Sequence, residues 1–416
     1  MNGQDQPKRA ENISAIVDYF KSGIKESCSE IGIELEHTLL KENGEAVSFD
    51  DPYGQEWLLE QLLDTYPEKI IDEEGSLIGI IGDHASVTLE PAAQFELSAG
   101  PFRTLAHAEE TFKKFESVLA GLTEAHGIEA LTPGYHPTCR AADLKLIPKR
   151  RYEIMNEYLG SISMFGICMM RGSAATQVAI DYCSVDDCLR KLRLANACTP
   201  LFSLICDNAP IFEGDIRPHE LMRTEIWLKC DPARCGTVPG VMQEGFTLED
   251  YAAYILDTPA MVARTDAGLA LSEKTIGELF AHKVMSSEDI EHALSVFFTD
   301  VRLKRYIEIR PADAMPLPCV IGFAALVKGL FYNEGSLTEL DRIFEGVDAN
   351  AILQAKVALM ENGYEASVYG HPASELVDEL MSLAATGLSS EESRYLEPLS
   401  AMAAQRTTLA SIALAK

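Results

Sequence analysis

Residues 300–310 read DVRLKRYIEIR, a stretch in which apolar and charged residues alternate. Side chains of a β-strand point alternately to the two faces of a sheet, so the alternation predicts one strand with an apolar face and a polar face. The polar face carries the cations Arg302, Lys304 and Arg310 and one carboxylate, Glu308. Cations that share a face repel one another unless solvent screens them or an anion lies between them. The stretch therefore raises the question of which anion it holds.

Further segments show the same alternation, and their polar faces carry a narrow choice of side chains. These polar positions are Glu34 and Glu36 in residues 31–39, Glu90, Gln94 and Glu96 in 89–98, Gln177 and Asp181 in 176–182, and Arg223, Glu225 and Trp227 in 222–227. Any one such strand is typical of an antiparallel sheet with a solvated second face. Taken together, the carboxylates gather on the N-terminal strands and the cations on residues 302–310.

Hard divalent cations such as Mg²⁺ bind carboxylate oxygens, and arginine and lysine bind phosphate oxygens. We therefore predict that the anion is ATP, bound with magnesium.

Composition and missing motifs exclude several other classes of protein. The 416 residues include 64 acidic and 35 basic side chains, a net charge of -29 that disfavours nucleic acid and anionic membranes as partners. There is no P-loop, no Rossmann glycine pattern, no H-E-x-x-H and no G-x-S-x-G. The longest apolar stretch, residues 316–327, contains two prolines and is too short to span a bilayer. The N-terminus has no secretory pattern, so we expect a cytoplasmic protein.

Ten cysteines are spread along the chain without a C-x-x-C pair, and a cytoplasmic address predicts that their thiols are reduced. Two C-x₄-C pairs occur, Cys183 with Cys188 and Cys230 with Cys235, but neither has a second pair or a histidine nearby. The spacing therefore argues against a structural zinc site at either pair.

Hydrophobic periodicity predicts an α+β fold. We expect helices over residues 12–29, 54–65, 104–126, 149–162 and 185–207, and strands over 31–40, 76–83, 85–101, 176–183, 222–228 and 301–310. Strands scattered between helices and joined by short turns are typical of a mainly antiparallel sheet. With no linker or repeat in the chain, we predict one catalytic domain over residues 1–416, of which 315–416 form a mainly helical C-terminal portion.

The order of these segments resembles a known family. The segments are GIELE (32–36), LEPAAQFELS (89–98), RYEIM (151–155), TQVAIDY (176–182), NAPIFEG (208–214), MRTEIW (222–227), DPARCG (231–236) and VRLKRYIEIRPAD (301–313). They occur in the order and approximate spacing of the plant and proteobacterial type of glutamate-cysteine ligase, over roughly residues 20–400. VRLKRYIEIR and QFELS are the most specific of them.

The resemblance implies a fold, a reaction and a set of site residues. The fold would be a glutamine-synthetase-like sheet curved into a funnel. The reaction would transfer the γ-phosphoryl group of ATP to glutamate, and the amine of cysteine would capture the γ-glutamyl phosphate. The implied residues are Glu34, Glu36, Glu90, Glu96 and Glu308 for magnesium; Arg151, Gln177, Arg223, Trp227 and Arg234 for substrate; Arg302, Lys304, Arg305 and Arg310 for nucleotide; and Glu308 and Arg310 as catalytic residues. Strict alternation places Arg305 on the apolar face of the predicted strand.

The chain also departs from the family pattern on the substrate side. Leu35 stands where the family has a basic residue or histidine, Ala179 replaces an asparagine, and Glu225 replaces a histidine. Gly172–Ala175 replace a Thr-Cys-Thr run with its preceding arginine, for which the adjacent Arg171 is a candidate substitute. Residues 311–317 lack the usual glycine-rich pattern. These departures leave open a ligase that uses an amine other than cysteine, or a non-catalytic protein that binds nucleotide. The partners expected in either case are small molecules, and the protein would be a monomer or a homodimer.

Simpler interpretations of the single residues also stay open at the level of sequence. Glu34 and Glu36 are interpreted alternatively as solvated strand carboxylates, and Trp227 as a core residue. Arg223 would alternatively pair with Asp231 or Glu225, and Arg234 would stabilise a turn. If the catalytic interpretation holds, Glu308→Gln or Arg310→Ala should abolish turnover and leave thermal unfolding unchanged.

Overall fold

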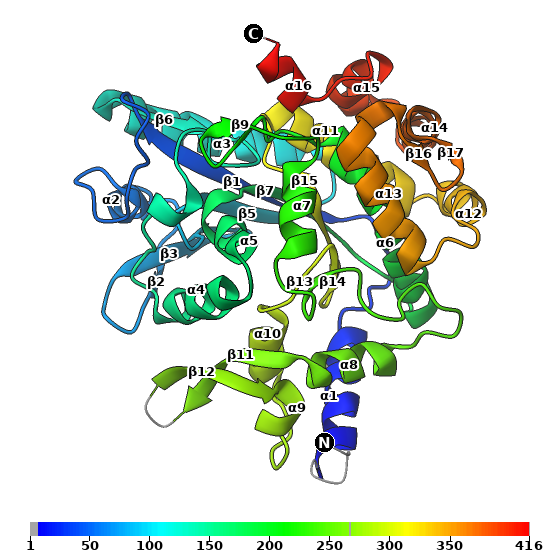
Figure 1. Cartoon of the computed structure of the whole chain (residues 1–416), viewed down its shortest axis with the longest axis horizontal. Coiled ribbons are helices and arrows are strands. Elements are labelled where there is room, and N and C mark those ends of the chain that lie inside the picture. The colour runs from blue at the N-terminus through cyan, green and yellow to red at the C-terminus, as the bar shows by residue number, and fades with distance from the viewer. Residues whose placement is uncertain (1–6, 266–267, 416) are drawn as a thin grey trace.

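A computed structural model describes residues 7–265 and 268–415 of the chain (Figure 1). Its main feature is a nine-stranded antiparallel sheet with the strand order β14-β15-β7-β1-β5-β4-β3-β2, in which β6 pairs with a second part of β1. The strands of this sheet are β1 (Ile31–Lys41), β2 (Glu68–Ile71), β3 (Leu77–Gly82), β4 (Ala85–Leu89), β5 (Phe95–Phe102), β6 (Ile128–Leu131), β7 (Ala175–Ile180), β14 (Val301–Leu303) and β15 (Ile307–Asp313). The predicted α+β class with an antiparallel sheet is confirmed.

Helices surround the sheet, and small two-stranded pairs lie outside it. The helices are α1 (Arg9–Lys21), α2 (Gln55–Gln61), α3 (Leu105–Thr123), α4 (Arg150–Ile162), α5 (Met164–Ile167), α6 (Val185–Ile205), α7 (Met222–Lys229), α8 (Leu248–Asp257), α9 (Ile276–Leu279), α10 (Ser287–Leu294), α11 (Leu317–Phe331), α12 (Glu334–Ile343), α13 (Ala349–Asn362), α14 (Ala373–Gly387), α15 (Glu397–Ala404) and α16 (Leu409–Leu414). The small pairs are β8 (Ile211–Phe212) with β9 (Asp215–Ile216), β10 (Cys235–Gly236) with β13 (Phe298–Thr299), β11 (Pro259–Thr265) with β12 (Gly268–Thr275), and β16 (Ser367–Val368) with β17 (His371–Pro372).

The two faces of the sheet differ in what covers them. The helices α3, α6 and α11 pack against one face, and the core forms between them and apolar side chains such as Leu35, Leu97 and Val178. The helix α11 is buried along nearly all of its length, which accounts for the long apolar stretch in the sequence. The helices α4, α5 and α7 lie over the other face, in front of the sheet in Figure 1. No helix within residues 7–265 and 268–415 is both long and apolar enough to cross a membrane.

The stretch predicted as one strand over residues 301–310 is a hairpin. The chain turns at residues 304–306, where Lys304 N–H donates to the Tyr306 carbonyl, so β14 pairs antiparallel with β15 and Arg302 lies opposite Glu308. The prediction of a single strand was therefore wrong. Directly opposed residues of an antiparallel pair share a face, so the division into an apolar and a polar face survives the turn. Arg305, at the tip, belongs to neither face.

Three further boundaries differ from prediction. Residues 85–101 are not one strand but the antiparallel pair β4 and β5, separated by a turn over residues 90–94. Residues 222–228 form the helix α7 and not a strand; a segment of seven residues is too short for a period of two to be told from 3.6. The first helix, α1, ends at Lys21 and not at residue 29, and the chain from 22 to 30 is a loop that leads into β1. The helix α7 still places Arg223 and Trp227 together, because residues four apart lie on one side of a helix.

Candidate active site

The register of the sheet places the polar residues of different strands in rows. Glu34 of β1 lies between Ser98 of β5 and Gln177 of β7. One step along the strands, Glu36 lies opposite Glu96, and Glu96 lies opposite Thr88 of β4. In the other direction, Gly32 lies opposite Ala179, which in turn lies opposite Glu308 of β15. The polar positions predicted on separate strands therefore converge on one face of one sheet.

Two cavities open on this face. The larger has a volume of 620 Å³ and is lined in part by Gly32, Glu34, Ala179, Tyr306 and Glu308. The smaller, of 320 Å³, lies between the sheet and the covering helices and is lined by residues of both. Both volumes fall within the roughly 300–1,000 Å³ that is typical of ligand pockets. Glu34 and Gln177 line both cavities, so a ligand that passes over these two side chains would reach from one cavity into the other.

Four carboxylates stand together at this junction: Glu34, Glu36, Glu90 and Glu96, all of which line the smaller cavity. Burial and the neighbouring carboxylates raise the pKa of Glu34 to about 8 and the pKa of Glu96 to about 7. The same causes raise the pKa of Glu36 and, with burial as the largest cause, the pKa of Glu90. The alternative of a solvated strand carboxylate is wrong for Glu36, whose side chain is buried, whereas Glu34 is partly exposed where the two cavities meet.

Glu308 has the opposite environment. Its carboxylate lies 2.5 Å from Arg302 Nε, 2.7 Å from Lys304 Nζ and 3.6 Å from an Arg310 amino nitrogen. Although burial acts against the charged form, these three cations hold the pKa of Glu308 well below its usual range. Glu308 is therefore an ionised carboxylate inside a cluster of cations. It lines the larger cavity together with Glu34, whose raised pKa is due in part to the charge of Glu308.

The cations at the smaller cavity come from both layers. Arg223 of α7 stacks on the Trp227 ring, with its guanidinium carbon 4.0 Å from the ring centre, and donates to the Arg310 carbonyl. Its Nε is buried without a hydrogen-bond partner among the described residues. Arg151 of α4 donates to Ser295. The pairing of Arg223 with Asp231 or Glu225 considered from sequence does not form, since those carboxylates pair with other side chains.

Some of the predicted site residues lie elsewhere. Arg234 is fully buried, pairs with Asp231 and donates to the Val296 and Pro259 carbonyls, and it lines neither cavity. Arg305, at the hairpin tip, lines the larger cavity but pairs with Glu291. Lys304 reaches the site only through its contact with Glu308.

Sequence reasoning assigned no role in the site to Lys149, Thr88 and Ser98. Lys149 lines the smaller cavity, and Glu90 is among the charges acting on it. The run Lys149-Arg150-Arg151 was the feature that could have indicated it. Thr88 and Ser98 each donate to Glu96 over 2.9 Å, which fixes that carboxylate. Both are small polar residues on predicted strands, and only their register identifies them.

The carboxylates fit magnesium held together with a phosphate. No three of them have oxygens within 4.8 Å of one another in the described chain, so they do not form a closed protein cage for one ion. Mg²⁺ is usually held by one or two carboxylates, with waters and substrate phosphates completing its shell. Carboxylates whose pKa values are raised by burial and by mutual repulsion are also the groups that a divalent cation would stabilise in the charged form. The donor set is therefore suited to Mg²⁺ only when a phosphate ligand is present to share it.

We expect magnesium to stabilise the protein more at high pH than at low pH. Since the pKa values of Glu34 and Glu96 are raised above the unfolded value near 4.5, the native state binds more protons, and stability without metal falls as pH rises from about 4.5 to about 8. Magnesium binds the deprotonated form, so the increase in Tm on adding Mg²⁺ with a non-hydrolysable ATP analogue should be larger at about pH 8.5 than at about pH 6. Differential scanning fluorimetry measures both. In Glu96→Gln the increase in Tm at about pH 8.5 should be smaller than in the parent. An equal increase in the parent at both pH values would contradict the assignment of these carboxylates to magnesium.

Arg234→Met should destabilise the protein without a specific effect on substrate binding. The change leaves Asp231, whose side chain is almost fully buried, without its cation, which costs about 3–5 kcal/mol of unfolding free energy. Urea unfolding measures this loss, and KM values measured on the folded fraction should stay within about twofold of the parent. An increase in the KM for one substrate, with stability unchanged, would contradict the structural role. It would support the prediction from the sequence that Arg234 binds substrate.

Three comparisons place the chain among known proteins. The family model described as glutamate-cysteine ligase family 2 matches residues 30–410. The chain is 30% identical over 331 residues to the chloroplastic glutamate–cysteine ligase B of Oryza sativa subsp. japonica, covering 77% of this chain and 66% of that protein. It is 32% identical over 288 residues to the chloroplastic glutamate–cysteine ligase of Arabidopsis thaliana, covering 67% of this chain and 55% of that protein.

A solved structure shares the fold. The glutamate–cysteine ligase of Francisella tularensis, crystallised in complex with AMP, superposes with a TM-score of 0.56 at 11% sequence identity. The match covers 92% of this chain and 83% of that one. By contrast, the chain spans about two thirds or less of the plant relatives described above.

Proposed function

The chain belongs to the glutamate-cysteine ligase family, and from that premise we propose that it is an ATP-dependent ligase that joins the γ-carboxylate of glutamate to the amine of cysteine. The product would be γ-glutamylcysteine, the dipeptide from which glutathione is made. The observation that carries the proposal is the place where the two cavities meet. There, four carboxylates with raised pKa values and several buried arginines line the same cavity.

The cavities suggest where the substrates bind. Gly32 and Ala179 have small side chains and lie side by side on the floor of the larger cavity, which leaves space for a flat base. We place the nucleotide there, with its phosphates over Glu34 and Gln177. Glutamate would bind in the smaller cavity, which Arg151 and Arg223 line and where the Nε of Arg223 has no hydrogen-bond partner among the described residues.

The protein side chains would act by charge and position. A carboxylate is a poor electrophile, and phosphorylation gives it a leaving group that an amine can displace. Arg310 and Arg302, both at the smaller cavity, would stabilise negative charge on the transferring phosphoryl group. Bound magnesium, held by Glu34, Glu36, Glu90 and Glu96, would neutralise phosphate charge. The covering helices α4 and α7 would limit the access of water, which would otherwise hydrolyse the acyl phosphate.

A second candidate uses a different amine with the same chemistry. Of the departures from the family pattern, Leu35 is buried on the core face and Glu225 pairs with His219 and Lys229, so neither position lines a cavity. Ala179 lines the larger cavity, and Ser173, within the altered run, lines the smaller one. Ser173 is thus the departure placed to change the choice of amine.

An amine panel tests both candidates. Purified protein with Mg-ATP and glutamate is assayed for ADP release with cysteine, 2-aminobutyrate, alanine, glycine or no amine, and products are identified by mass spectrometry. Cysteine should give the fastest release and a γ-glutamyl product. 2-Aminobutyrate, which replaces the thiol by a methyl group, is the matched control for thiol recognition. Turnover with glutamate and an amine other than cysteine, but not with cysteine, would support the second candidate. Nucleotide binding without any turnover would indicate a non-catalytic protein.

The cellular location and the oligomeric state remain part of the proposal. We propose a cytoplasmic enzyme, although the plant relatives carry the description chloroplastic. Cell fractionation tests the location. Sedimentation of the purified protein distinguishes the monomer from the homodimer.

A further inference from the structure

Two cysteines and an aspartate meet next to segments that line the larger cavity. Cys28 lies in the loop between α1 and β1, and Cys183 lies in the loop between β7 and α6. Their sulfur atoms and a carboxylate oxygen of Asp187 all lie within 4.8 Å of one another. Within residues 7–265 and 268–415, this is the one group of three or more Cys, His, Asp and Glu side chains that meets so closely. Neither C-x₄-C pair of the sequence forms it, since Cys183 pairs with Cys28 and not with Cys188.

The geometry points to a binding site for a thiophilic divalent metal ion, of which zinc is the biological example, formed by Cys28, Cys183 and Asp187. The Cys183 sulfur lies 3.4 Å from Asp187 Oδ2. At a tetrahedral zinc ion with ordinary Zn–S and Zn–O bond lengths, a sulfur and an oxygen ligand lie about 3.5 Å apart. A metal ion that replaced the thiol proton would therefore leave this pair almost unmoved. Thiolate ligands select zinc over magnesium, so this site and the carboxylate cluster would bind different metal ions.

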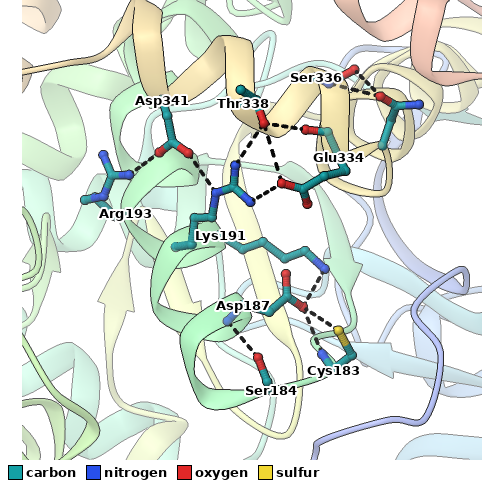
Figure 2. A network of polar contacts seen from close by, with 11 residues as sticks. Cys183, Ser184, Asp187, Lys191, Arg193, Glu334, Ser336, Thr338 and Asp341 are labelled. Atoms are coloured by element: carbon teal, nitrogen blue, oxygen red, sulfur yellow. Dashed lines mark hydrogen bonds and ion pairs between the residues drawn. The ribbon is translucent and has the colours of Figure 1, made fainter.

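The surroundings of the cluster balance the charge of such an ion. Lys191, whose side chain is almost fully buried, places its ammonium 3.0 Å from Asp187 Oδ2 and 3.0 Å from the Asp181 carbonyl, and Figure 2 shows Asp187 between Lys191 and Cys183. Two thiolates and one carboxylate carry three negative charges, which a divalent ion and the Lys191 ammonium together neutralise. The cluster also lies at the N-terminus of α6, where the helix dipole stabilises thiolates.

The carboxylate distinguishes a metal site from a disulfide. A disulfide would need only the two sulfur atoms, whereas Asp187 adds a third ligand on the same side. All ten cysteines are free in the structure. Burial and the neighbouring Cys183 and Asp187 raise the pKa of Cys28 to about 12, so it is a protonated thiol at neutral pH. Binding the ion would release the protons of both thiols to solvent, and the fourth ligand position would be filled by water or a small molecule.

A metal ion here would connect two segments that form the rim of the larger cavity. Lys25 and Glu30, which flank Cys28, line that cavity, and so does Asp181, two residues before Cys183. The two loops already meet through Tyr332, whose hydroxyl donates to the Glu30 carbonyl and accepts from the Asp181 N–H. Metal binding would therefore fix the loop of residues 22–30 against the end of β7.

Cobalt titration tests the site without an assay of activity. Reduced protein in excess Mg²⁺, without oxygen, is titrated with Co²⁺, which gives thiolate-to-cobalt charge-transfer absorption only when sulfur binds it. We expect this absorption to saturate at one equivalent, to be displaced by Zn²⁺, and to be lost in Cys28→Ser and in Cys183→Ser. Asp187→Asn should weaken binding, and Cys139→Ser, at a half-buried cysteine outside the cluster, should leave it unchanged.

Two results would overturn the metal site. They are no thiolate absorption in the parent, and the same absorption in the Cys28→Ser/Cys183→Ser double variant. Circular dichroism of each variant shows that it is folded. Hydrogen exchange supplies a second measurement, because Zn²⁺ should slow exchange in residues 22–30 of the parent and not of the double variant. None of these measurements uses turnover, so their results do not depend on the ligase assignment.

Discussion

Arg310→Ala is expected to lower kcat/KM by about 10³–10⁵, the range found when an arginine that stabilises a transferring phosphoryl group is lost. Burial and the neighbouring Arg302 lower the pKa of Arg310 to about 10, which still leaves it charged at neutral pH. Its guanidinium donates to Gln177, and its Nε is buried with no hydrogen-bond partner among the described residues. The charge is therefore held at the junction of the two cavities, and the Nε–H of Arg310 is left as a hydrogen-bond donor for phosphate.

Initial rates of ADP release measure this effect, with kcat and the KM for ATP determined separately. Arg310→Lys keeps the charge but loses the planar fork, so it should recover part of the loss. Arg342→Ala, at an exposed ion pair on α12, is the matched control and should behave like the parent. Activity of Arg310→Ala within about tenfold of the parent would remove Arg310 from the catalytic machinery.

Glu308→Gln is expected to abolish measurable turnover and also to lower the unfolding free energy by about 3–5 kcal/mol, the cost of breaking a buried ion pair. The glutamine would leave Arg302 without the carboxylate that its Nε contacts at 2.5 Å, and Lys304 without its partner at 2.7 Å. The positions of these cations, and with them the site, depend on Glu308. This revises the expectation from sequence that the variant would unfold normally.

Urea unfolding and ADP release, measured on the same preparation, separate the two effects of Glu308→Gln. Glu379→Gln removes one partner of an exposed ion pair with Arg342 and should change stability by less than about 1 kcal/mol. If Glu308→Gln unfolded at the same urea concentration as the parent, the cation cluster would not depend on the carboxylate. Retained turnover would contradict the catalytic role.

Part of the site could be predicted because alternation along a strand is a local property. Glu34, Glu36 and Glu96 were placed on the polar face of their strands, and the structure brings that face to the cavities. Glu308 shared the same face, yet the hairpin register places Arg302 opposite it, and its environment is cationic. Alternation gave the side on which each residue lies, and only the pairing of strands gave its neighbours.

The errors have equally local causes. Residues 222–228 were predicted as a strand because seven residues do not distinguish the two periods, and contacts with the rest of the chain fix them as α7. Arg234 was assigned to the substrate by resemblance, but its guanidinium pairs with Asp231 in the interior. The cluster of Cys28, Cys183 and Asp187 combines positions 155 residues apart in sequence, and no spacing rule would have joined them.

The amino-acid sequence by itself determined the α+β class, the polar faces of the strands and the family resemblance, because periodicity and motif order can be read along the chain. Tertiary structure alone decided which charges became neighbours. It gathered four carboxylates whose pKa values rise and enclosed a fifth among three cations. The physical reason is that a pKa and an ion pair depend on distances of a few ångströms between side chains, and these are set by strand register and burial and not by position in the chain.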